Sequence, residues 1–131
     1  MQIPSDAHAD RPLAFSLYYF ASDEGGPRAD AQRRLLFESA RFADRHGFSA
    51  VWAPERHFHA FGGLSPNPSV MAGALAALTK NVRIRSGSVV VPLHHPVRVV
   101  EEWSVVDFLS GGRVDLGLAS GWFPNDFVLA P

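Results

Sequence analysis

Four polar side chains follow directly after an apolar segment near the middle of the chain. The segment 48–53, FSAVWA, has the composition of a buried strand, and Glu55, Arg56, His57 and His59 come just after it. Carboxylate and imidazole groups can transfer protons, and a guanidinium group can stabilise negative charge. Parallel α/β proteins place their chemistry at the carboxyl ends of strands, so the pattern predicts a functional site here.

The same residues admit two other interpretations. Glu55, His57 and His59 are ligand types found in metal-dependent hydrolases, although the sequence offers no convincing further ligands for a tetrahedral site. A hydrogen-bonded loop with a purely structural role is the second alternative. The chain has no cysteine, which excludes disulfides, thiolate metal sites and a cysteine nucleophile.

Apolar and turn residues predict four strands that alternate with three helices. The strands are expected at 13–20, 48–53, 82–91 and 113–119, and the helices at 29–46, 69–79 and from Pro96 to the Gly111–Gly112 pair. The first strand is nearly all apolar, as expected for a strand covered on both faces. The predicted buried faces of the first and third helices are Leu35, Leu36, Phe42, Ala43, and Val99, Val100, Trp103, Val106, Leu109.

This alternation indicates an α/β fold with a parallel sheet. A complete (β/α)8 barrel needs about 250 residues, and this chain has 131. We therefore expect a partial TIM (β/α)8 barrel, with about the first four strands and three helices, and with unpaired edges on the first and fourth strands. Residues 1–12 are expected to form a flexible N-terminal tail, and 13–131 a single domain.

Composition limits the classes of partner. Hydrophobic residues make up 47% and charged residues 19%, and the formal net charge is −1. This balance predicts neither nucleic acid nor membrane as a partner. No apolar stretch approaches the roughly 18 residues of a membrane helix, and the N-terminus lacks the pattern of a signal peptide. A cytoplasmic protein is the default expectation.

Three residues outside the central stretch have types or positions that suggest a role. Gly87 lies inside a predicted strand, which indicates a bulge or the close approach of a ligand. Asp115 also lies within a strand, where it could be an ion-pair partner or a catalytic group. Trp122 follows the last strand and could form a wall of a substrate pocket.

Three motifs, in this order and spacing, resemble the N-terminal half of the bacterial luciferase-like flavin-dependent monooxygenases. They are WAPERHF at 52–58, SPNPSV at 65–70, and the long segment VVVPLHHPVRVVEEWSVVDFLSGGRVDLGLASGW at 89–122. The resemblance runs from Leu13 to Pro131. The sequence SGWFPNDF at 120–127 is typical of the branch found in natural-product biosynthesis.

The resemblance implies a TIM barrel that uses reduced FMN and O2 to oxidise an organic substrate. Some relatives use the deazaflavin F420 instead, and FMN is the expected cofactor here. The implied partners are a small-molecule substrate, O2, and a flavin reductase that supplies reduced FMN. The chain would be part of a homo-oligomer or of a larger chain.

The resemblance also implies roles for the residues after the second strand. The luciferase subunit that performs the chemistry has Glu-His-His-Phe there, and its first histidine is catalytic. This chain has Glu55, Arg56, His57 and Phe58. Because arginine does not act as a base near neutral pH, either His57 takes the acid/base role or this branch does without it. Arg56 could stabilise a developing peroxide anion.

The cofactor-binding residues implied by the resemblance lie within the third strand and at or after the end of the fourth. The family has a cis peptide bond without proline, packed against the flavin, and its position falls on Gly87–Ser88. Ala119 and Ser120 stand where luciferase has a reactive cysteine and an arginine close to the flavin. Asp126 matches an acidic residue beside the active site.

An alternative function belongs to a different class, that of proteins without catalytic activity. The family's flavin phosphate site lies mostly in the second half of the barrel. The alternative is therefore a non-catalytic fragment or dimerisation partner of a luciferase-like protein.

Overall fold

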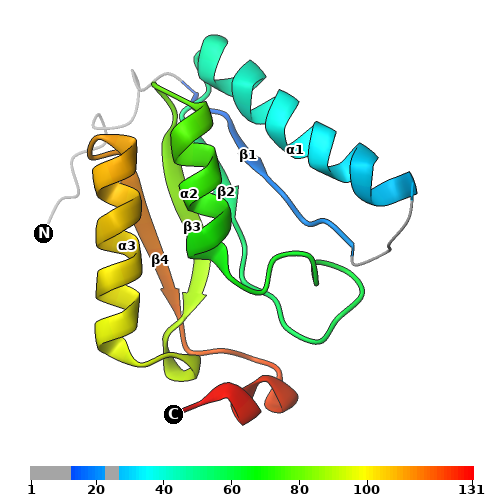
Figure 1. The fold of residues 1–131 in the computed structure, drawn as a ribbon, viewed down its shortest axis with the longest axis vertical. Helices are drawn as coiled ribbons and strands as arrows, with labels where there is room; N and C mark the ends of the chain where they lie inside the picture. The colour runs from blue at the N-terminus through cyan, green and yellow to red at the C-terminus, as the bar shows by residue number, and fades with distance from the viewer. Residues whose placement is uncertain (1–12, 23–26) are drawn as a thin grey trace, which may run out of the picture.

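The structure, a computed structural model, describes residues 13–22 and 27–131. The predicted tail, residues 1–12, lies outside the described residues. Four strands alternate with three α-helices, as the sequence predicts, and two short 3-10 helices, η1 and η2, follow β3 and β4 (Figure 1). The elements are β1 (Ser16–Tyr18), α1 (Pro27–Arg45), β2 (Ala50–Ala53), α2 (Pro68–Leu78), β3 (Arg83–Val90), η1 (Val91–Leu93), α3 (Pro96–Ser110), β4 (Val114–Ala119) and η2 (Pro124–Leu129).

The four strands form one parallel sheet in the order β1-β2-β3-β4. Within the described residues β1 and β4 are therefore the sheet edges, as predicted. The three helices cover one face of this sheet, and the strands run toward the loops drawn at the lower end of Figure 1. Parallel strands joined by helices bring the carboxyl ends of all four strands to the same side.

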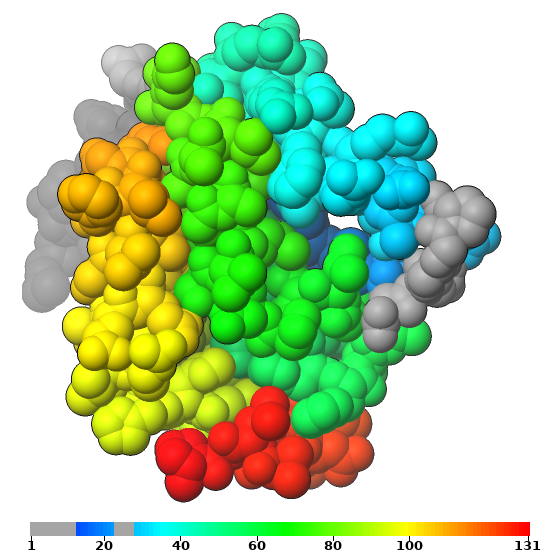
Figure 2. Space-filling view, in the orientation of Figure 1, coloured from blue at the N-terminus to red at the C-terminus, as the bar shows by residue number. Residues whose placement is uncertain are grey.

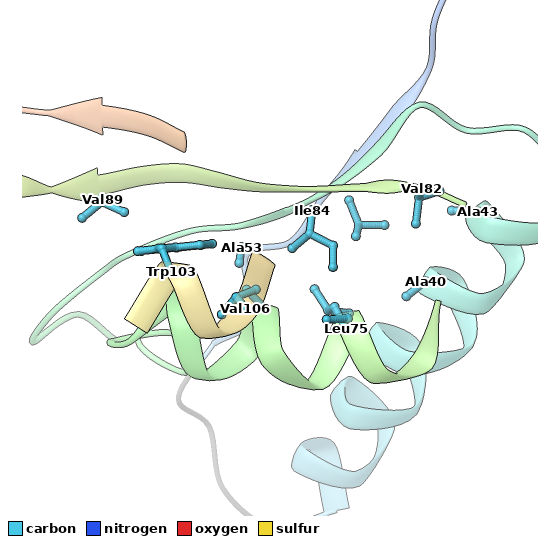
Figure 3. Close-up of a cluster of buried hydrophobic side chains, with 12 residues drawn as sticks. Ala40, Ala43, Ala53, Leu75, Val82, Ile84, Val89, Trp103 and Val106 are labelled. Carbon is cyan, nitrogen blue, oxygen red and sulfur yellow. The ribbon is translucent and has the colours of Figure 1, made fainter. Parts of the chain in front are cut away.

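The core lies between the sheet and the helices (Figure 3). Leu75 of α2 and Ile84 of β3 are fully buried, and Trp103 and Val106 of α3 pack against the same layer. Small residues let the helices approach the strands closely. The buried cluster is Ala40, Ala43, Val51, Ala53, Ala72, Leu75, Ala76, Val82, Ile84, Val89, Trp103 and Val106.

Some predicted burial is wrong. Leu35 and Phe42 of α1 are 65% and 47% exposed, because α1 meets the core through Ala40 and Ala43. The α3 face is narrower than expected, with Val100 66% exposed. Leu109, also predicted to be buried, is 52% exposed.

The first strand also differs from its prediction. β1 has three residues, and Leu13, which precedes it, is 87% exposed. A strand at the sheet edge with helices on one face only cannot be covered on both faces. The continuous apolar run of 13–20 is therefore not matched by burial on both sides.

Helix ends follow ordinary capping chemistry. The Asn67 side chain accepts hydrogen bonds from the backbone N–H groups of Ser69 and Val70 at the start of α2. The His95 side chain accepts a hydrogen bond from the backbone N–H of Val97 at the start of α3. Gly111 ends α3 with a φ of 70°. Within the described residues, no helix is both long enough and apolar enough to cross a membrane.

Candidate functional site

A pocket of about 270 Å³ lies where the carboxyl ends of the four strands meet. Each strand end contributes to it, and the segment after β4 lies against the loop that follows β2 (Figure 2). All the site residues predicted from the sequence line this pocket except His57. The lining residues come from all four strand ends. They are Tyr18 in β1 and Phe20 after it; Glu55, Arg56 and His59 after β2; Gly87, Ser88 and Val90 in β3; and Ala119, Ser120, Gly121, Trp122 and Asp126 from the end of β4 onward.

Glu55 ties three chain segments together behind the pocket. Its side chain is 0% exposed. Oε1 lies 2.8 Å from His57 Nε2 and 2.7 Å from His94 Nε2, and Oε2 accepts a hydrogen bond of 2.8 Å from the Val90 backbone N–H. A buried carboxylate with all these donors is well compensated. Glu55 therefore fixes the end of β2 to the end of β3 and to the start of α3.

His57 is buried, with 7% of its surface exposed. It contacts the carboxylate of Glu55 and does not line the pocket. The structure therefore places His57 behind Glu55, in the layer that supports the pocket wall. The contact between Glu55 and His94 was not predicted, because the two residues are 39 positions apart in the sequence.

Arg56 faces the pocket from the loop after β2. Its guanidinium carbon lies 5.6 Å from the ring centroid of Phe61 and 5.4 Å from that of Trp122, within the range of cation–π contacts. Gly62 has a φ of +83°, and a Cβ there would lie 2.6 Å from Arg56 Cδ. Glycine is thus required beside this arginine on both counts. Trp122 lines the pocket, as predicted.

The peptide bond between Gly87 and Ser88 is cis, as the family resemblance implied. The pairing of β3 with β4 shifts register between Gly87 and Val89, which confirms the predicted bulge. The Tyr18 hydroxyl donates a hydrogen bond to the Gly87 carbonyl. A Cβ on Gly87 would lie 2.6 Å from Tyr18 Cε2 and 2.9 Å from Trp52 Cε3, so these rings fill the space of a side chain.

The residues after β4 close the opposite side of the pocket. Ala119 is the last residue of β4, Ser120 follows it, and Gly121 turns the chain with a φ of +85°. Asp126, in η2, is only 8% exposed, and its Oδ1 is buried without a hydrogen-bond partner. This acidic side chain therefore lies in the pocket lining.

The sheet face away from the helices carries an ion-pair network. Asp115 accepts hydrogen bonds from Arg83 and Arg85, and the Arg85 guanidinium lies 5.2 Å from the Trp52 ring centroid. The hydrogen bond from Arg83, the largest influence, lowers the pKa of Asp115 to about 2. Asp115 does not line the pocket, which favours the ion-pair role over the catalytic one. Trp52, on the same face, is outside the buried cluster.

A larger hollow, of about 680 Å³, lies between α1 and α2 and was not predicted (Figure 2). Its lining is mostly apolar and includes Leu35, Leu36 and Met71. The segment 29–46 has more apolar residues than the narrow buried face of α1 can hold. This excess was the sequence signal that could have indicated the hollow. Among the residues that the structure describes, no group of three or more His, Cys, Asp or Glu could hold a metal ion.

Comparisons with known proteins place this geometry in a family. A sequence profile of the family described as luciferase-like monooxygenase matches residues 15–130. The oxygenase component of the flavin-dependent trigonelline monooxygenase of Acinetobacter baylyi is 37% identical over 92 residues, which are 70% of this chain and 25% of that protein.

Two solved structures have a similar fold. The monooxygenase RslO1 from Streptomyces bottropensis matches with a TM-score of 0.80 and 31% identity, over 88% of this chain and 36% of its own. The oxygenating constituent of 3,6-diketocamphane monooxygenase from Pseudomonas putida, a type II Baeyer–Villiger monooxygenase in complex with FMN, matches with a TM-score of 0.77 and 23% identity. That match covers 87% of this chain and 31% of the P. putida chain.

The chain spans between 25% and 36% of the length of these proteins. A parallel sheet of four strands, with helices between them, is the part of a TIM barrel that this length accounts for. With 116 consecutive positions matched by the family profile, from 15 to 130, this chain belongs to the luciferase-like monooxygenase family.

Proposed function

We propose that this chain forms part of the active site of a flavin-dependent monooxygenase, which uses reduced FMN and O2 to oxidise a small organic substrate. The observation that carries the proposal is the pocket at the ends of all four strands. It gathers Arg56, the cis peptide Gly87–Ser88, Ser120 and Asp126 in a chain that belongs to this family. In barrel enzymes this end of the strands holds the active site.

The pocket fits one part of a flavin. Gly87 lines the wall with the rings of Tyr18 and Trp52 packed against it, and Ser88 and Ser120 offer hydroxyl groups for the edge of a flat ring. Arg56 is the one arginine in its lining. Ligand pockets usually have volumes of about 300 to 1,000 Å³, so a pocket of about 270 Å³ is too small to be the site of the whole cofactor.

FMN is preferred to F420 as the cofactor. The A. baylyi relative is named a flavin-dependent monooxygenase, and the P. putida structure contains FMN. Reduced FMN, when bound, supplies the electrons that activate O2. Ser88, Ala119 and Ser120 would line the ring, and the remaining binding groups would come from chain beyond this segment.

Arg56 would stabilise negative charge that develops in the pocket, because its guanidinium is fixed there by Phe61 and Trp122. Glu55 and His57 would act one layer further out, where the carboxylate orients the end of β2. In this account Glu55 and His57 position Arg56, and the catalytic position that the family gives to histidine is taken by arginine.

The proposed partners follow from the same family. A separate flavin reductase would supply reduced FMN, since the A. baylyi relative is named an oxygenase component. The sequence of 120–127 supports a substrate from natural-product biosynthesis. A homo-oligomer is supported by the apolar outer face of α3, where Val100 is 66% and Phe108 83% exposed.

A non-catalytic fragment or dimerisation partner is the second candidate. The specific observation in its favour is coverage of 25% to 36% of the related proteins. In that case the pocket would be one side of a site that this chain does not complete. The two candidates differ in whether the chain binds reduced flavin.

An anaerobic titration of the purified chain with reduced FMN tests the proposal, with the mass in solution measured on the same sample. Saturable binding by a defined oligomer is the result expected for an active-site segment that associates. Absence of saturable binding by a folded chain would instead favour the second candidate.

A further inference from the structure

Three unpaired polar atoms surround the strand-end pocket. Arg56 Nε, His59 Nε2 and Asp126 Oδ1 are each buried and have no hydrogen-bond partner in the described part of the chain. All three residues line the same pocket. Buried polar atoms are nearly always hydrogen-bonded, so a cluster of exceptions around one pocket indicates partners that belong to a ligand.

Two of these residues carry opposite charges and do not pair with each other. No ion pair joins Arg56 to Asp126 among the described residues, although both line a pocket of about 270 Å³. Elsewhere in the same structure Asp115 pairs with Arg83 at 2.5 Å and with Arg85 at 2.8 Å. Because Arg56 and Asp126 do not pair, the guanidinium of Arg56 can donate a hydrogen bond to a ligand and the carboxylate of Asp126 can accept one.

Arg56 contacts aromatic rings instead of a carboxylate. Its guanidinium lies against Phe61 and Trp122, and Gly62 makes room for its side chain. His59 is itself held by Phe123, with ring centroids 4.5 Å apart. Arg56 and His59 are thus held against aromatic rings.

The aromatic side chains that line the pocket indicate the shape of the ligand. Trp122 is 68% exposed and Phe20 41% exposed, and both line the pocket. Exposed rings on a pocket wall favour a flat apolar molecule that can stack on them.

We propose that Arg56 and Asp126 recognise two ends of one planar aromatic substrate. Arg56 binds an anionic or carbonyl oxygen of the substrate, and Asp126 accepts a hydrogen bond from its hydroxyl group. The substrate class is therefore a hydroxylated aromatic acid or ketone. This inference rests on the proposed monooxygenase function and names the substrate side of the same site.

A matched pair of probes tests it by calorimetry on the full chain. 3-Hydroxybenzoate carries both groups, and 3-methoxybenzoate keeps the ring and the carboxylate but has a methyl group in place of the donor hydrogen. The wild-type chain is expected to bind 3-hydroxybenzoate at least about tenfold more tightly, because a hydrogen bond to a charged group is lost in the methoxy compound. Equal affinities, or no binding of 3-hydroxybenzoate, would overturn the proposal.

Variants locate the two contacts. In Asp126→Ala the preference for the hydroxyl is expected to disappear, and in Arg56→Met both probes are expected to bind about tenfold more weakly or worse. Asp126→Leu keeps about the size of the side chain without an acceptor and serves if the alanine variant does not fold. Arg98→Met and Asp30→Ala, on the exposed surfaces of α3 and α1, are the controls and should behave like the wild type. Unchanged probe affinity in folded Arg56→Met would contradict the assignment.

A titration of the same variants with reduced FMN separates this inference from the proposed function, since a flavin ring edge also carries acceptors and a donor. Binding of FMN without binding of the probes would contradict the substrate assignment and leave the proposed function standing. Loss of FMN binding in Arg56→Met and Asp126→Ala, with probe binding unchanged, would assign both residues to the flavin and equally overturn it. Failure of both ligands would overturn both proposals.

Discussion

Oε1 of Glu55 lies 2.7 Å from Nε2 of His94, which joins the end of β2 to the residues before α3. The same oxygen contacts His57, and the other carboxylate oxygen contacts the Val90 backbone N–H. One inaccessible side chain therefore organises the support of the pocket. This arrangement explains why a glutamate is needed here even though its carboxylate does not reach the pocket interior.

Glu55→Gln is expected to destabilise the fold by about 1–3 kcal/mol, because a buried charged acceptor with several donors is replaced by an amide. Urea denaturation measures the free energy of unfolding. The control is Glu101→Gln on the exposed side of α3, where Glu101 pairs with Arg98 at 3.2 Å; its effect should stay within about 0.5 kcal/mol. Equal effects of the two substitutions would show that the Glu55 contacts are not stabilising.

Gly87→Ala is expected to destabilise the fold by roughly 1–3 kcal/mol, since the new methyl group would overlap the rings of Tyr18 and Trp52. The matched control is Gly73→Ala in α2, where a Cβ meets nothing within 4 Å. That substitution should stabilise the helix by about 0.5–1 kcal/mol. Thermal and urea unfolding of both variants would check the opposite signs, and a neutral Gly87→Ala would mean that the rings are not packed against Gly87.

Asp44 is a third position with a clear expected effect, at the end of the molecule away from the pocket. Its Oδ1 accepts hydrogen bonds from the backbone N–H groups of Lys80, Asn81 and Val82 at 2.9, 2.6 and 3.0 Å. Asp44→Ala should cost about 1–3 kcal/mol of unfolding free energy, because the link between α1 and the start of β3 is lost. Asp30→Ala, in the exposed pair with Arg33, is the control. A loss no greater than that of the control would disprove the link.

The low pKa of Asp115 predicts a dependence of stability on pH. Hydrogen bonding to Arg83 is the main cause of the shift from 3.8 to about 2 in the folded protein. Because the folded state holds the charged carboxylate more strongly than the unfolded state, the stabilisation is complete above about pH 4. It is lost as the pH falls toward 2.

Asp115→Asn provides the comparison for this prediction. The wild type should be more stable than the variant at pH 5, and the difference should shrink between about pH 4 and pH 2. Urea midpoints at constant ionic strength measure this. A difference that stays constant down to pH 2 would show that Asp115 is not stabilised as a carboxylate in the folded state.

The alternation of strands and helices could be predicted from the sequence because each turn carries local signals. Gly47 has a φ of 74° at the end of α1, and Gly111 has a φ of 70° at the end of α3. The pocket that Glu55 and Arg56 line could also be placed, because these residues follow a strand whose end must lie beside its neighbours in a parallel sheet. The cis bond at Gly87–Ser88 came from the family resemblance and not from local pattern.

Burial was harder to predict than order. Leu35 has the same apolar character as Leu75, but the first is 65% exposed and the second fully buried. The difference depends on how closely each helix approaches the sheet, which helical periodicity does not encode. In the same way, no local sequence signal predicts the contact between Glu55 and His94. None predicts that Arg56 and Asp126 do not pair, because these relationships arise only when distant segments meet.

The most direct test of the central claim is an anaerobic NMR titration of the ¹⁵N-labelled chain with reduced FMN. The claim is that the strand-end pocket is the flavin-binding surface of this chain. It predicts saturable shifts of the amides of Gly87, Ser88 and Ser120, with those of Asn81 and Val82 at the opposite end of the sheet unchanged. Absence of shifts at the pocket, or larger ones along the hollow between α1 and α2, would contradict it.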